Sequence, residues 1–248
     1  MSPDPRHLVL GTAGHIDHGK TALIKALTGT DTDRLAEEKE RGISIELGYA
    51  ELELPSGPTM SVIDVPGHER FVRNMVAGAS GINIFLLVVA ADDSVMPQTR
   101  EHMAIIEMLG IPQGIIAITK TDLVDEEMLE LVQADIEDFL EATPYADAPM
   151  AGVSSKTGEG IPLLLGLLEE AAGRASQAHQ ASGVARLPVD RVFTLNGIGT
   201  VVTGTLWSGN ICTEDTLRLM PDDLTCRART VKVHDHSVEC AEAGYRVA

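Results

Sequence analysis

Short apolar runs alternate with amphipathic stretches along the chain as far as Gly173. Apolar runs of four to eight residues predict β-strands, and apolar residues at helical spacing predict α-helices. The predicted strands are His7–Thr12, Met60–Val65, Asn83–Ala90, Gly114–Thr119 and Met150–Val153. The predicted helices are Lys20–Leu27, Gln98–Leu109, Glu126–Glu141 and Ile161–Ala172. This alternation predicts an α/β domain with a mainly parallel sheet and helices on both faces.

One further strand is predicted at the edge of this sheet. Glu46–Leu54 alternates polar and apolar residues, which is typical of a half-buried strand. It precedes the turn Pro55-Ser56-Gly57-Pro58 and the strand Met60–Val65. We therefore expect the two strands to pair as a hairpin.

The pattern changes after Gly173. Small and polar residues follow, which favours a linker over 174–186. From Leu187 onward, short Val- and Thr-rich runs alternate with glycine-containing turns, a pattern typical of a small β-barrel. We expect an α/β domain at 1–173 and, at 187–248, a partial β-barrel that lacks some of its strands.

Composition narrows the class of protein. The 248 residues are 44% hydrophobic but only 3% aromatic, so we expect an ordered, aliphatic core. The formal net charge of −18 argues against nonspecific coating of nucleic acid. Neither a membrane-length apolar run nor a signal peptide is seen, which predicts a cytoplasmic protein. Three cysteines without a CxxC motif agree with a reducing compartment.

A phosphate-binding loop is predicted between the first strand and the first helix. Residues 14–21, GHIDHGKT, fit the pattern G-x-x-x-x-G-K-[ST]. Backbone N–H groups of Asp17, His18 and Gly19 would meet phosphate oxygens, and Lys20 would reach the outer phosphates. The hydroxyl of Thr21 would bind Mg²⁺. An ordinary glycine-rich turn is the alternative, but the flanking strand and helix argue against it.

Three later motifs are candidates for contacts to magnesium, to the γ-phosphate and to the base of a nucleotide. Asp64-Val65-Pro66-Gly67 ends a strand, where Asp64 can hold the magnesium and the N–H of Gly67 can meet a γ-phosphate. Thr119-Lys120-Thr121-Asp122 ends another strand, and its carboxylate can accept from two N–H groups of guanine that adenine does not offer. Ser154-Ser155-Lys156 can present backbone N–H groups to the guanine oxygen. Taken singly, the second motif is equally compatible with a capped turn.

In this order the motifs resemble those of the translational GTPases. Residues 27–49, LTGTDTDRLAEEKERGISIELGY, and Pro188–Phe193 are similar to the selenocysteine-specific elongation factors within that superfamily. The resemblance implies GTP/GDP and Mg²⁺ as cofactors, selenocysteinyl-tRNA and the ribosome as partners, and a monomer without membrane contact. The family's third barrel and RNA-binding domain are not found here, so we expect contact with an mRNA element only through those absent domains.

The same resemblance assigns roles to single residues. His68 resembles the residue that orients the attacking water, and Ile16 and Ile43 resemble the apolar gate that restrains it. The alternatives are a solvated loop histidine and two ordinary packing residues. Ser44 stands where the family has a threonine that binds Mg²⁺, and we expect its hydroxyl to suffice. Thr119 stands in place of an asparagine and offers one hydrogen-bond donor fewer.

The barrel segment contains a candidate pocket for the aminoacyl group. Asp190, Arg191 and Arg246 resemble residues that the family places around selenocysteine, although an ordinary edge-strand ion pair is the alternative. His234, His236 and Cys240 form a weak zinc pattern without a clear fourth ligand, for which solvent-facing histidines and a buried thiol are the simpler interpretation. Arg70 and Arg73 could contact ribosomal RNA or be a solvated helix face.

Other functions stay open at this point. A Tu-type or initiation-factor-two gamma-type carrier of aminoacyl-tRNA is the nearest alternative. A GTP-gated binding switch with negligible catalysis is another. A P-loop kinase is less favoured, because the motifs at Thr119 and Ser154 would then have no task.

Overall fold

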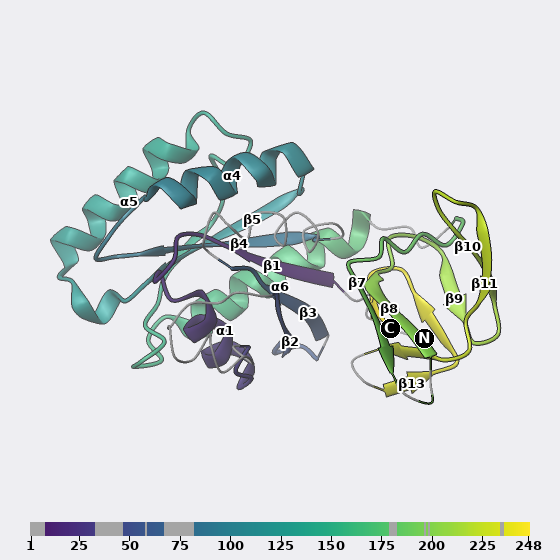
Figure 1. Cartoon of the computed structure of the whole chain (residues 1–248). Helices are drawn as coiled ribbons and strands as arrows, with labels where there is room; N and C mark the ends of the chain where they lie inside the picture. The colour runs from purple at the N-terminus through teal and green to yellow at the C-terminus, as the bar shows by residue number, and fades with distance from the viewer. Residues whose placement is uncertain are drawn as a thin grey trace. The chain divides into compact units, whose positions relative to one another are not determined.

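A computed structural model of the chain describes residues 8–32, 47–57, 59–66, 82–178, 183–195, 197, 199–233 and 236–248. The chain divides after Ala178 into two units, which we call the α/β unit and the β unit (Figure 1). The α/β unit corresponds to the predicted α/β domain, and the β unit to the predicted barrel.

A six-stranded sheet is the centre of the α/β unit. Its strands are β1 (Leu8–Ala13), β2 (Gly48–Glu53), β3 (Thr59–Asp64), β4 (Ile84–Ala90), β5 (Gln113–Thr119) and β6 (Met150–Gly152). Their spatial order is β2-β3-β1-β4-β5-β6. Only β2 is antiparallel to its neighbour, and the other pairs are parallel. The mainly parallel sheet and its antiparallel edge strand are therefore confirmed.

Helices cover both faces of this sheet (Figure 1). They are α1 (Lys20–Thr28), α4 (Pro97–Leu109), α5 (Glu126–Leu140) and α6 (Ile161–Ala178), with the short 3₁₀ helix η2 (Thr121–Leu123). Successive side chains of a strand point to opposite faces. Phe85 and Leu87 of β4 accordingly pack with α4 and α5, whereas Leu86 and Val88 pack with α1 and α6. All of β4 is buried, which explains its uninterrupted apolar sequence.

Helix α6 differs from its predicted extent. It continues to Ala178, so the first residues of the expected linker are helical. Ala171 and Ala175 are buried against the sheet, and alanine is the best helix former, so a small-residue sequence here extends the helix. Every helix in the described part of the chain is too short or too polar to span a bilayer.

The β unit is built from short antiparallel strands. These are β7 (Arg191–Leu195), β8 (Gly199–Thr205), β9 (Asn210–Cys212), β10 (Thr216–Leu219), β11 (Leu224–Arg227), β12 (Val231–Val233), β13 (His236–Val238), β14 (Cys240–Glu242) and β15 (Arg246–Val247). Five form a sheet in the order β13-β12-β15-β8-β7, and β10-β11 and β9-β14 form two pairs. A small aliphatic core around Leu206, Ile211 and Val231 is buried among them. The barrel-like architecture is thus confirmed.

The cysteines of the β unit differ from the expectation. Cys212 of β9 and Cys240 of β14 are partners in the antiparallel register, and their sulfur atoms form a disulfide. Cys226 is an exposed free thiol. Cys240 is therefore neither a buried thiol nor a thiolate ligand, and no metal-ligating cluster occurs among the residues that the structure describes. His234 lies outside those residues, whereas His236 begins β13 and is exposed, in agreement with the simpler interpretation of a solvent-facing histidine.

Candidate nucleotide-binding site

The phosphate-binding loop joins β1 to α1 and requires unusual backbone conformations. Gly14, Asp17 and Gly19 have φ values of 132°, 61° and 81°, in the region that glycine adopts without strain. A Cβ atom at Gly14 would also lie 2.1 Å from the carbonyl oxygen of Val88. The glycines are therefore needed both to turn the chain and to let it approach β4. The turn ends at the N-terminus of α1, where backbone N–H groups and the helix dipole favour an anion.

Lys20 is buried at the centre of this loop. Its Nζ donates to the carbonyl oxygens of Gly14 and His15, at 3.0 and 2.6 Å. Burial lowers the pKa of Lys20 to about 8, against the opposing effect of the carboxylates of Asp64 and Asp17. The ammonium group is thus held inside the loop by hydrogen bonds to neutral carbonyl oxygens. Negatively charged phosphate oxygens would form stronger hydrogen bonds with it.

The carboxylate of Asp64 accepts hydrogen bonds from three threonine hydroxyl groups. Its Oδ1 accepts from Thr12 at 2.9 Å, and its Oδ2 accepts from Thr21 at 2.8 Å and from Thr32 at 2.7 Å. The carboxylate is 1% exposed. Thr21 and Asp64 were predicted as metal ligands, and the structure brings them together. Carboxylate and hydroxyl oxygens are the hard ligands that Mg²⁺ prefers, so this group fits the ion.

A pocket of about 660 Å³ opens beside the loop. Its lining includes residues from the loop, from α1 and from the ends of β5 and β6: Gly19, Ala22, Lys25, Ala26, Thr119, Lys120, Asp122, Leu123, Ser155 and Lys156. The Oγ of Ser154 donates to Oδ1 of Asp122 at 2.7 Å, and Nζ of Lys156 lies 3.9 Å from its Oδ2. The side chain of Asp122 is 17% exposed. The structure therefore brings together the residues that were predicted to contact the base.

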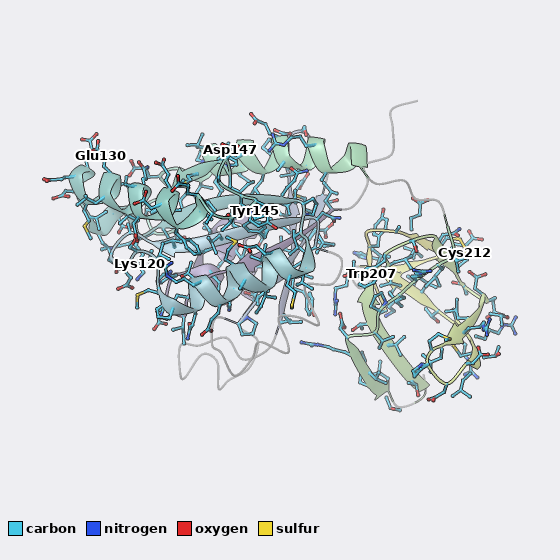
Figure 2. All side chains as sticks on the ribbon, turned by 90° about the horizontal axis from the view of Figure 1, so that it is seen from above. Lys120, Glu130, Tyr145, Asp147, Trp207 and Cys212 are labelled. Carbon is cyan, nitrogen blue, oxygen red and sulfur yellow. A yellow bond between two sulfur atoms is a disulfide. The ribbon has the colours of Figure 1, made fainter. Side chains whose placement is uncertain are left out.

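Lys120 and Thr119 connect this pocket to neighbouring loops. Lys120, which is labelled in Figure 2, has a left-handed backbone with φ 58°. Its Nζ pairs with both carboxylate oxygens of Asp92 at 3.0 Å. The hydroxyl of Thr119 donates to the carbonyl oxygen of His18 at 2.6 Å. The single donor that threonine offers in place of asparagine thus ties the end of β5 to the phosphate loop.

The side chain of His18 was not expected to matter, yet it is fully buried. Its Nδ1 lies 3.4 Å from the carbonyl oxygen of Val88, while its Nε2 has no hydrogen-bond partner among the described residues. Burial lowers the pKa of His18 to about 4, so the ring is neutral near pH 7. Burial is predicted from the periodic spacing of residues in helices and strands. His18 lies in a loop, so no such spacing indicated that its side chain is buried.

Several predicted residues lie outside the part of the chain that the structure describes. These are Gly67, His68, Ile43, Ser44, Arg70 and Arg73. Of the predicted gate, only Ile16 is described, and its N–H donates to Oε1 of Gln98 at 2.9 Å. The roles of the undescribed residues stay predictions.

The β unit contains a buried ion pair. Nη1 and Nη2 of Arg246 contact Oδ2 and Oδ1 of Asp190 at 2.6 and 3.0 Å, with both side chains mostly buried. The hydroxyl of Thr203 donates to Asp190 at 2.7 Å and accepts from Arg246 at 3.2 Å. Arg191 begins the edge strand β7 and is half-buried. Two of the three residues predicted for the aminoacyl pocket are therefore in direct contact.

The fold and the loop geometry are those of a P-loop nucleotide-binding protein. Comparison with known proteins gives the family. The sequence profile of the elongation factor Tu GTP binding domain matches residues 5–173. The chain belongs to this family of GTP-binding translation factors.

The relatives point to one branch of that family. The chain is 50% identical to the selenocysteine-specific elongation factor of Desulfomicrobium baculatum over 97% of its own length and 38% of the relative's. It superposes on a bacterial selenocysteine-specific elongation factor with a TM-score of 0.87, at 37% identity, covering 98% of this chain and 41% of that one. For elongation factor SelB from Methanococcus maripaludis in complex with the GTP analogue GPPNHP, the TM-score is 0.86, at 31% identity over 98% and 51%. The chain thus spans about two fifths of the curated relative.

Proposed function

We propose that this chain is the GTP-binding portion of a factor that carries selenocysteinyl-tRNA to the ribosome and releases it on GTP hydrolysis. The observation that carries the nucleotide part is the base pocket, where Ser154 holds the carboxylate of Asp122 beside the phosphate loop. The cargo part is supported by the similarity to selenocysteine-specific elongation factors.

Guanine selectivity follows from the chemistry of Asp122. A carboxylate accepts hydrogen bonds from N1–H and the 2-amino group of guanine, whereas adenine offers neither donor, so both of these charge-assisted bonds would be lost. Asp122→Asn should therefore weaken GTP binding and admit xanthosine nucleotides, which carry a carbonyl in place of the amino group. Competition among GTP, ATP and XTP tests this assignment. An unchanged preference for GTP in the variant would contradict it.

Hydrolysis breaks the bond between the γ-phosphorus and the oxygen that bridges to the β-phosphate, while a water oxygen bonds to the γ-phosphorus. GDP, inorganic phosphate and a proton result. In our proposal His68 orients the water, Ile16 and Ile43 restrain that histidine, and Lys20 stabilises charge on the outer phosphates. Thr21, Ser44 and Asp64 would hold Mg²⁺, which shields the phosphate charge. His68→Ala should keep GTP affinity and lose ribosome-stimulated hydrolysis in a single-turnover assay.

The cargo site would use charge. A selenol is far more acidic than the hydroxyl of serine, so selenocysteine is anionic near neutral pH while serine is neutral. Arg246, oriented by Asp190, and Arg191 would supply cationic donors. A hydrogen bond to a charged group is worth roughly 1.5–3 kcal/mol, or about ten- to a hundredfold in affinity.

The cargo is tested with a protein that also carries the domains its relatives have beyond this segment. Arg246→Ala and Arg191→Ala should each weaken binding of selenocysteinyl-tRNA and leave binding of seryl-tRNA unchanged. Equal losses for both would mean that the arginines hold the tRNA backbone or the barrel.

Preference for another aminoacyl-tRNA would favour a Tu-type carrier, and absence of ribosome-stimulated hydrolysis would favour a binding switch. We further propose that the protein is a cytoplasmic monomer.

A further inference from the structure

Helix α4 contacts the phosphate loop through two side chains. Nδ1 of His102 accepts from the N–H of Gly14 at 2.9 Å, and Oε1 of Gln98 accepts from the N–H of Ile16 at 2.9 Å. Residues four apart lie on the same face of a helix, so both acceptors come from one side of α4. The first half of the loop therefore directs two of its N–H groups toward acceptors on α4.

The chemistry of His102 keeps its acceptor available. Nδ1 can accept only when it carries no proton, so the neutral ring has its proton on Nε2. His102 is 1% exposed, and burial, followed by the positive charge of Lys20, lowers its pKa to about 3. Around pH 7 the bond to Gly14 is thus always possible.

The other partner of this segment would be shared with a bound phosphate. Nζ of Lys20 donates to the carbonyl oxygens of Gly14 and His15, and its three N–H groups would be divided between these oxygens and a phosphate. The two bonds from α4 do not compete with phosphate, because they use the N–H groups of Gly14 and Ile16 and not those of residues 17–19, which were assigned to phosphate. They are therefore the contacts that can preserve the shape of residues 14–16 in both states.

We propose that His102 and Gln98 are positioning residues of the phosphate site, which hold the loop in its binding shape while Lys20 turns to the nucleotide. This inference rests on the nucleotide site of the proposed function. It predicts that the hydrogen-bond acceptor at position 102, and not the ring itself, determines affinity for the β-phosphate.

The test compares two substitutions of similar size. His102→Asn keeps an acceptor, since its Oδ1 is as many bonds from Cβ as Nδ1 of histidine, whereas His102→Leu removes it. We expect His102→Leu to weaken GDP binding about tenfold, the usual worth of one hydrogen bond, and His102→Asn to bind within about threefold of the wild type. Gln98→Met should resemble His102→Leu, and Glu107→Gln, on the exposed side of α4, should change nothing.

GMP provides the readout that separates positioning from general damage. It lacks the β-phosphate, so its affinity should be nearly the same in all variants. Unchanged GDP affinity in His102→Leu, equal losses in His102→Leu and His102→Asn, or equal losses for GDP and GMP would each overturn the inference. Failure of the proposed function would show differently, as a wild-type protein that does not prefer GDP to ADP.

Discussion

The two units are held together in different ways. In the α/β unit, strand β4 is buried along its whole length between helices on both faces. In the β unit, β7 and β11 are largely exposed, and a small core is accompanied by a disulfide and a buried ion pair. Apolar burial is spread over many residues, whereas cross-links concentrate stability in a few. The α/β unit can therefore give polar residues such as Lys20 and Asp64 to ligand binding, and the β unit depends on its polar contacts for cohesion.

The largest expected effect breaks the binding site of the α/β unit without affecting the β unit. Lys20→Ala removes a charge that would contact the two outer phosphates of GTP, so GTP affinity should fall by about a thousandfold. The affinity is measured with a fluorescent, non-hydrolysable GTP analogue. Trp207, the single tryptophan of the chain, lies in the β unit and reports the unfolding of that unit separately (Figure 2). Lys232→Ala, on an exposed position of β12, is the control and should leave both signals unchanged.

A second experiment removes the covalent cross-link of the β unit. The disulfide closes a segment with a sequence separation of 28. Its reduction should lower the free energy of unfolding of the β unit by about 3 kcal/mol, mainly by freeing the unfolded chain. Denaturation followed by Trp207 fluorescence, with and without reductant, measures the change. Cys226→Ser should have no effect, and a midpoint that is insensitive to reductant would show that the pair does not contribute.

The ion pair of the β unit should have a smaller effect. Asp190→Asn leaves the guanidinium of Arg246 with a neutral partner in a mostly buried position, which should cost about 2 kcal/mol of unfolding free energy. Asp223→Asn, in the exposed pair with Arg218, should cost less than about 0.5 kcal/mol. Similar losses in the two variants would mean that burial of the first pair is unimportant. GDP affinity should be the same in both.

The smallest effect is a pH dependence confined to the α/β unit. Lys20 has a pKa of about 8 in the free protein, and bound phosphates would raise it, so the complex holds more protons than the free protein above pH 8. GDP affinity, measured without Mg²⁺, should therefore fall about tenfold between pH 7 and pH 9. The stability of the free protein against unfolding should change with pH in the opposite direction. Between pH 8 and 10.5 the unfolded chain binds more protons at Lys20 than the folded protein, so the free energy of unfolding rises with pH. Lys20→Ala should abolish both trends.

Sequence patterns were sufficient for features that depend on neighbouring residues. Strand β4 and helix α5 were predicted to within a residue or two, because an uninterrupted apolar run and a helical period are local signals. The phosphate loop and the motif around Asp122 were recognisable because their spacing is short. The end of α6 was missed because small residues suit both a linker and a helix packed closely on a sheet.

Contacts between distant residues could not be predicted in this way. His102 and Gly14 are 88 positions apart, and Thr119 and His18 are 101 apart. Neither pair follows a period or a motif, and each depends on which helices and loops the sheet order places side by side. For Cys212 and Cys240, only the register of β9 and β14 reveals that they are partners.

The three hydroxyl groups on Asp64 have a consequence for turnover. Asp64 would be one of the residues that hold Mg²⁺, and an isolated buried carboxylate would be costly without the ion, but the hydroxyls of Thr12, Thr21 and Thr32 satisfy it. Spontaneous release of GDP and Mg²⁺ should accordingly be slower in Thr32→Val, as stopped-flow fluorescence would show.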